Sequence, residues 1–195
     1  TRNENWRGGQ DQVQEQQFHR FLPTSCTTAG FATCWASASN GDELDLSAGT
    51  LSSWDGIRIG VQLTLQNKYA SIACSADEGA CVWQGASENC VVYIWDNGGI
   101  TTLSFIILKN GHATSGGGLY VYNANVVLIL VLLVDNHCET NGGAIYVTYR
   151  GSSSATLHGC SFAGNTASGS APDVFNFQET VVIGGCPEGK PIFIH

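Results

Sequence analysis

Short apolar segments alternate with turn residues along most of the chain, and this pattern predicts many short β-strands. From residue 103 onward the pattern repeats as a unit of apolar strand, apolar-x-x-Asn turn, Gly-rich bend and second strand. The turn motif occurs at Ile107–Asn110, Leu133–Asn136 and Phe162–Asn165, which places the three Asn residues 26 and 29 positions apart. The bend and second strand follow at Gly116–Val121, Gly142–Val147 and, in degenerate form, Ala171–Asn176.

A repeat of this length with two or three short strands is typical of one coil of an all-β parallel solenoid. Adjacent coils pair strand on strand about 4.8 Å apart, so equivalent residues stack on one another. We therefore expect Asn110, Asn136 and Asn165 to form a hydrogen-bonded ladder. Strand-like segments at 41–50, 57–65 and 91–94 extend the pattern toward the N-terminus. The repeat length predicts about six coils.

The chain divides into three predicted parts: an extended N-terminal arm over residues 1–23, the solenoid over 24–189 and a strand-like tail over 190–195. The arm is polar with isolated apolar residues, and the tail is apolar. Both are expected to pack on their own solenoid or on a neighbouring copy. The residues expected to make these assembly contacts are Trp6, Val13, Phe18, Phe21, Ile192, Phe193 and Ile194.

The longest apolar run, residues 126–134, is too short to span a bilayer and predicts a strand buried on both faces. No membrane insertion is therefore expected.

Charged residues make up only 12% of the chain, and sixteen acidic against eight basic residues give a net charge of −8. A chain with so few cations cannot build the basic surface that nucleic acids require, which excludes them as partners, and the same argument disfavours electrostatic docking on anionic lipids. The sequence begins at Thr1 and contains no Met. We expect a mature product whose signal peptide has been removed.

Eight cysteines without a Cys-x-x-Cys pair favour disulfides in an oxidising, extracellular compartment over a zinc or thioredoxin-like site. Two expected pairs close small loops, one joins residues a repeat length apart, and the last follows by elimination. These pairs are Cys26–Cys34, Cys74–Cys81, Cys160–Cys186 and Cys90–Cys138.

Three motifs resemble a known group of proteins. Gly-Asp-x-x-x-Leu-x-x-Gly-Thr at Gly41–Thr50 is similar to the first coil of pectin-lyase-like right-handed parallel β-helices. Gly142–Ile145 and Phe162–Asn165 resemble the paired GGAI and FxxN motifs of polymorphic outer-membrane-protein repeats. The resemblance covers roughly residues 36–188. It implies a right-handed parallel β-helix and says little about activity.

Many proteins of this resemblance cleave acidic polysaccharides, but their catalytic motifs are missing from the sequence. It has no Asn-Thr-Asp, no adjacent Asp pair, no Gly-His-Gly and no Arg-x-Lys. We therefore predict no enzymatic activity and no cofactor.

Two groups of residues could still form a binding site. His112, Asp135, Asn136 and His137 are expected on one edge, with the two His near each other and not directly stacked. They could form an acid–base site or a metal site, although we favour a solvated turn ladder. The aromatic residues could bind glycans, although we favour packing. The aromatic candidates are Trp35, Trp54, Trp83, Trp95, Tyr120, Tyr122, Tyr146 and Tyr149.

The open ends of a short solenoid must be covered, and the two tails could cover the ends of neighbouring copies. The leading hypothesis is an extracellular structural protein, the subunit of a filament or surface layer. The alternatives are a polysaccharide-binding or polysaccharide-cleaving protein and a cell-surface adhesin-like module. Ice binding is a weaker alternative, because the sequence shows no regular Thr-x-Thr array.

Overall fold

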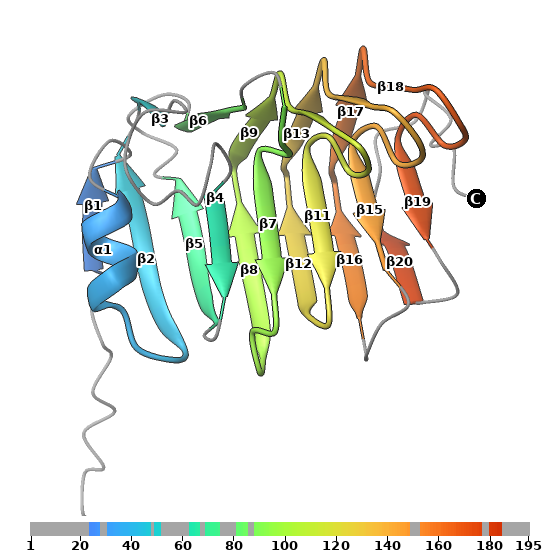
Figure 1. Ribbon diagram of the computed structural model, residues 1–195. Helices are drawn as coiled ribbons and strands as arrows, with labels where there is room; N and C mark the ends of the chain where they lie inside the picture. Colours follow the sequence, from blue (N-terminus) through green and yellow to red (C-terminus); the bar gives the residue numbers. More distant parts are fainter. Residues whose placement is uncertain are drawn as a thin grey trace, which may run out of the picture.

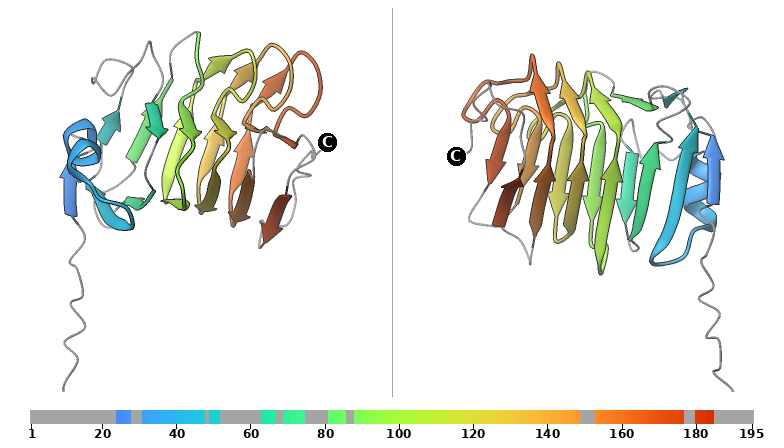
Figure 2. Two further views of the ribbon diagram at one scale, coloured as in Figure 1. Left: turned by 60° about the horizontal axis from the view of Figure 1, so that its bottom comes forward. Right: turned by 180° about the vertical axis from the view of Figure 1, so that it is seen from behind.

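The computed structural model describes residues 24–27, 31–47, 49–51, 63–66, 69–74, 81–85, 88–148, 153–176 and 180–184. These residues form a parallel β-solenoid of about 4 turns, which confirms the predicted all-β fold. Figure 1 shows the strands of successive coils lying side by side along the solenoid, and the two views of Figure 2 agree. The N-terminal arm and the C-terminal tail lie outside the described residues.

Among the described residues, sheet A is the longest of four sheets and has seven parallel strands. Its strands, in spatial order, are β1 (Thr24–Thr27), β2 (Asp42–Ser47), β5 (Ala70–Cys74), β8 (Ile100–Ser104), β12 (Asn125–Ile129), β16 (Ser154–His158) and β20 (Thr180–Gly184). Side chains alternate between the core and the outer face in β12, where Val126 and Leu128 are buried, and in β5 and β16.

In the part of the chain that the structure describes, sheets B and C each contain five parallel strands, and sheet D contains three very short ones. Sheet C consists of β4 (Leu63–Gln66), β7 (Val92–Trp95), β11 (Leu119–Tyr122), β15 (Ile145–Val147) and β19 (Val174–Asn176). Sheet B consists of β3 (Gly49–Leu51), β6 (Cys81–Gln84), β9 (Ile106–Lys109), β13 (Leu132–Val134) and β17 (Ser161–Ala163). Sheet D consists of β10 (His112–Ala113), β14 (His137–Cys138) and β18 (Thr166–Ala167).

The number of coils is lower than the sequence predicts. Within the described residues, a strand in each of sheets C, A and B is present in four successive coils, which begin at β4, β7, β11 and β15. The prediction of about six also counted the incomplete ends, where β2–β3 and β19–β20 each supply only two of the three strands.

The apolar run 126–134 is two strands, so the prediction of one strand buried on both faces is wrong. The chain bends between β12 and β13 at Leu130, which has a φ of 52° and is 53% exposed. Val127 and Ile129 point outward from sheet A, while their neighbours Val126 and Leu128 are buried. A corner of the solenoid therefore interrupts a sequence that looks uniformly buried.

The Gly-rich bends lie where the sequence analysis predicts. Gly116 and Gly142 have φ values of 62° and 71°, a region that Gly occupies without a steric penalty. The next Gly in each bend touches another part of the solenoid: a Cβ on Gly117 would lie 2.3 Å from the His137 carbonyl oxygen. The bend therefore needs Gly for two separate reasons, backbone conformation and close packing of coils.

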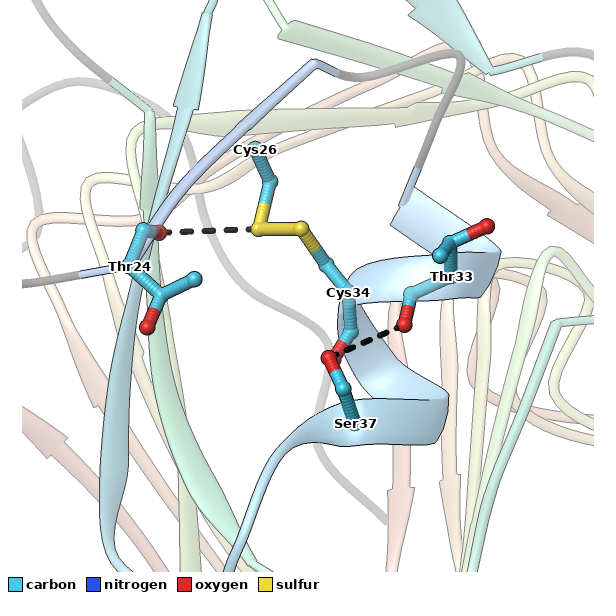
Figure 3. Close-up of a disulfide and its surroundings, with 5 residues drawn as sticks. All are labelled: Thr24, Cys26, Thr33, Cys34 and Ser37. Carbon is cyan, nitrogen blue, oxygen red and sulfur yellow. Dashed lines mark hydrogen bonds between the residues drawn. A yellow bond between two sulfur atoms is a disulfide. The ribbon is translucent and has the colours of Figure 1, made fainter.

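A short helix covers the core at the N-terminal end of the solenoid. This helix, α1 (Phe31–Ser37), packs against β1 and is held to it by the Cys26–Cys34 disulfide (Figure 3). Phe31 is fully buried, and its ring lies 5.3 Å from that of Trp83 and 6.2 Å from that of Trp35, centroid to centroid. The aromatic side chains of α1 thus close the apolar interior at this end.

Candidate functional site

A buried Asn ladder joins two coils at the turn between sheets B and D. Asn136 is 0% exposed, and both its backbone N–H and its side-chain Nδ2 donate to Asn165 Oδ1 at 3.1 Å. Nδ2 also donates to the Leu108 carbonyl oxygen, and Oδ1 accepts from the Gly111 N–H at 3.0 Å. One side chain therefore satisfies buried backbone groups on the coil before it and stacks on the coil after it.

Asn110 does not belong to this ladder, which corrects the predicted alignment by one residue. Leu108, not Ile107, pairs with Leu133, so Asn110 is level with Asp135. Asn110, Asp135 and Gly164 form a separate column in which every residue has a φ between 52° and 66°. The apolar-x-x-Asn pattern misses the shift because Ile107 and Leu108 are both apolar, and only burial separates them.

The two predicted histidines stack directly, closer than the sequence spacing suggests. His112 and His137 are paired in sheet D, with ring centroids 4.6 Å apart in an edge-to-face arrangement. His137 Nδ1 shares a hydrogen bond of 2.7 Å with the Thr166 hydroxyl on the next coil. Among the described residues, no group of three or more His, Cys, Asp and Glu is placed to hold a metal ion. The geometry is that of a turn ladder, and the metal-site alternative gains no support.

An aromatic column runs along the outer face of sheet C. Its rings come from β7, β11, β15 and β19, and successive centroids are 5.2, 5.1 and 5.3 Å apart. The members, in order, are Tyr93, Tyr120, Tyr146 and Phe175. Sequence analysis found the middle two and missed the outer two. The same repeat spacing, 27 residues before Tyr120 and 29 after Tyr146, would have found them.

Two of the three ring pairs in the column are stacked face to face, and Tyr93 is tilted by 47° to Tyr120. Tyr146 lies at 21° to Tyr120 and at 13° to Phe175, which are stacked arrangements. A sugar bound by stacking needs an exposed ring face. Burial, followed by the neighbouring Tyr120, raises the pKa of Tyr93 to about 12. This column joins coils and does not form a flat sugar platform.

A second aromatic pair beside the column is more exposed. Trp95 is 42% exposed and meets Tyr122 edge to face, with centroids 6.2 Å apart. In the adjoining bend, Asn123 Nδ2 donates to Asp96 Oδ1 at 2.9 Å. Exposed rings thus lie near polar groups at this corner. Of the other candidates, Trp35 and Trp83 belong to the core, while Trp54 and Tyr149 lie outside the described residues.

Another buried Asn, which sequence analysis missed, holds the corner between sheets C and A. Asn97 is 2% exposed, and its Nδ2 donates to the Thr101 hydroxyl at 3.1 Å and to the Asn125 carbonyl oxygen at 2.9 Å. The Asn97-Gly98-Gly99 turn was a signal for such a residue.

Two of the four predicted disulfides are confirmed, Cys26–Cys34 and Cys74–Cys81. The predicted Cys90–Cys138 bond is wrong, because Cys138 is a free cysteine. Elimination alone predicts that pair. In the fold, Cys138 lies in sheet D between Ala113 and Ala167, and Cys90 precedes β7. Burial raises the pKa of the Cys138 thiol.

The Cys160–Cys186 disulfide remains a prediction. Cys160 is buried, but Cys186 lies outside the described residues. All seven residues predicted to make assembly contacts also lie outside them: Trp6, Val13, Phe18, Phe21, Ile192, Phe193 and Ile194.

In the described part of the chain, no helix has the length and apolarity needed to cross a membrane. Comparison with protein-family models, with curated proteins and with solved structures finds no match to this chain.

Proposed function

We propose that this protein is an extracellular structural protein, the subunit of a self-assembling filament or surface layer. One observation carries the proposal: the side chains that could have formed a site are used to join one coil to the next. This holds for the Asn136–Asn165 ladder, the His112–His137 pair and the aromatic column. Such stacking stiffens a solenoid along its axis, which suits a mechanical role.

The resemblance to pectin-lyase-like β-helices with polymorphic outer-membrane-protein-type repeats belongs to the same proposal. In support, Gly142 has the positive φ and Gly143 the close packing that explain Gly-Gly in the first motif. Asn165 of the second motif is the ladder residue. The two disulfides are compatible with a secreted protein.

Helix α1 limits the ways in which such subunits could join. Because its buried aromatic residues cover the core at the N-terminal end, a second solenoid cannot simply continue the coils there. Contacts must then come from segments that reach around the helix or from the lateral faces. The arm over residues 1–23 and the tail over 190–195 are the segments proposed to make them.

Negative-stain electron microscopy and sedimentation velocity of the full chain test the proposal. We expect filaments or sheets, and we expect deletion of residues 1–23 to abolish them while the circular dichroism spectrum keeps its β character. A full chain that stays monomeric at high concentration would contradict the proposal. A deletion variant that still assembles would move the contacts from the arm to another part of the molecule.

A second candidate is polysaccharide binding, and the exposed Trp95 beside Tyr122 and the Asp96–Asn123 pair favours it. An exposed indole with polar neighbours is suited to a pyranose ring. Titration with neutral, cationic and anionic polysaccharides tests this function, with Trp95→Ala as the variant and Phe105→Ala as an exposed control. Binding that is equal in both variants would remove Trp95 as the site.

A further inference from the structure

Over most of its length, the outer face of sheet A carries no ionisable side chain other than His158. The strands β5, β8, β12, β16 and β20 contain no Asp, Glu, Lys or Arg, although the whole chain has a net charge of −8. The preceding strand, β2, is different, because Glu43 and Asp45 point outward from it. The uncharged face therefore has a sharp acidic border at its N-terminal side.

Exposed apolar side chains gather on the same face. Of the five large hydrophobic residues that are strongly exposed in the described part, four belong to sheet A or to the bends that follow its strands. They are Ile100 at 55%, Phe105 at 44%, Leu130 at 53% and Val182 at 50%. Ile100 and Val182 lie on the strands, and Phe105 and Leu130 lie in the bends at the edge of the face. Exposed apolar surface with a polar border is typical of an interaction site.

The centre of the face is a column of β-branched residues in register. Thr102 pairs with Val127, Val127 with Thr156, and Thr156 with Val182. β-Branched side chains have few rotamers, so they form a stiff and flat surface. Two such sheets can pack face to face about 10 Å apart.

We infer that a second copy of this chain docks on the outer face of sheet A, with the two solenoids running in opposite directions. The inference deepens the proposed function, since it supplies a lateral contact between subunits, and it rests on that function for its biological role. The partner is argued from charge: two chains of net charge −8 repel each other, and this uncharged face is where they can approach at least cost.

The acidic border sets the direction of packing. If the two solenoids ran the same way, Glu43 and Asp45 of one copy would face the same residues of the other, which is unfavourable. A two-fold axis that lies between the two sheets and runs parallel to β12 avoids this clash. β12 is the middle one of the five strands without Asp, Glu, Lys or Arg. The axis places β2 beyond the partner's β20, because β2 is three strands from β12 and β20 only two.

This arrangement is self-complementary. With the axis along β12, Val127 faces its own copy, and so do Ile129 and Asn125. The strands on either side exchange places, so Thr102 on β8 faces Thr156 on the partner's β16. Near the axis, Val127 and Ile129 therefore meet apolar groups, and Thr102 meets a hydroxyl. Farther out, Ile100 faces Ser154 and Ser71 faces Val182.

The size of the face predicts a weak dimer. Five strands about 4.8 Å apart and about five residues long, at about 3.3 Å per residue, give a flat area of about 400 Å². A stable interface buries about 800 Å² on each partner, so association should depend on concentration.

Cross-linking of full-length variants with a short bis-maleimide tests both the face and the direction. We expect Val127→Cys to give a covalent dimer in much higher yield than Val134→Cys, an outward control on sheet B. A mixture of Ser71→Cys and Val182→Cys should cross-link to each other far better than Ser71→Cys alone. Equal yields for Val127→Cys and Val134→Cys would overturn the inference, and efficient self-linking of Ser71→Cys would overturn the opposed direction.

Sedimentation velocity supplies the second measurement. Val127→Lys places two like charges opposite each other and should raise the concentration needed for dimerisation about tenfold or more, since tenfold corresponds to about 1.4 kcal/mol. An unchanged dimer would contradict the docking face. Electron microscopy separates the two proposals: cross-linking at Val127 without filaments would reject the assembly function alone, and filaments without cross-linking would reject the docking face alone.

Discussion

Asn136→Ala should strongly destabilise the solenoid. The substitution removes the acceptor of the Gly111 N–H and a donor to the Leu108 carbonyl, and both residues are buried. A buried polar group that loses its partner costs about 1–3 kcal/mol, so the two groups together cost about 2–6 kcal/mol. Since domains of this kind are stable by about 5–15 kcal/mol, a large part of the stability would be lost.

The matched control is Asn110→Gly. Asn110 is exposed, lies outside the ladder and has a φ of 56°, which Gly adopts freely. We therefore expect a change in the free energy of unfolding within about 1 kcal/mol. The assay is urea denaturation followed by circular dichroism and by Trp fluorescence, which reports on buried Trp83.

The two variants together decide between the structural register and the sequence alignment. If Asn110 were a ladder residue, both substitutions would destabilise the protein by similar amounts. A loss below about 1 kcal/mol for Asn136→Ala would refute the argument that its hydrogen bonds satisfy otherwise unpaired backbone groups.

Three further predictions concern other parts of the fold. Replacing Cys26 and Cys34 together by Ser should lower the free energy of unfolding by about 2–3 kcal/mol, because the disulfide spans only 8 residues. Trp fluorescence should shift to the red as α1 loosens. An unchanged spectrum and melting midpoint would show that the disulfide does not hold α1 over the core. Tyr146→Ala should lower the free energy of unfolding by about 1–3 kcal/mol more than Tyr146→Phe, because it removes two stacked ring pairs. Equal effects of the two substitutions in urea denaturation would show that ring stacking contributes little. The raised pKa of Tyr93 means that the folded state holds the phenolic proton more tightly than the unfolded state does, so stability should fall as the pH rises from 10.0 to about 12. Tyr93→Phe should reduce this fall. Denaturation midpoints of the unchanged protein that stay constant over this pH range would contradict the prediction.

The periodic pattern was sufficient for the fold because a solenoid is built from local repeats. Gly142–Val147 aligns with Gly116–Val121 in the sequence, and the last three residues of the two segments pair in sheet C. The three-residue insertion between the second and third repeats falls between β15 and β16 and leaves the strands before and after it in register. The close disulfides, Cys26–Cys34 and Cys74–Cys81, could also be predicted, since loop length alone makes them favourable.

The corners of the solenoid could not be predicted, because they depend on which side chains face the core. Ile107 and Leu108 are equally apolar, yet only Leu108 is fully buried, and that difference shifts Asn110 out of the ladder. Leu130 is as apolar as its neighbours and still turns a corner in the left-handed region.

The sequence by itself determined the coil, its repeat length and the Gly positions that bends require, because these follow from the local backbone and from residues one repeat apart. The tertiary structure alone decided the exact columns: His112 over His137, Asn136 over Asn165, and the uncharged Thr102–Val127–Thr156–Val182 column. Each column collects residues from several coils whose lengths differ by a few residues, so only the paired strands fix which side chains meet.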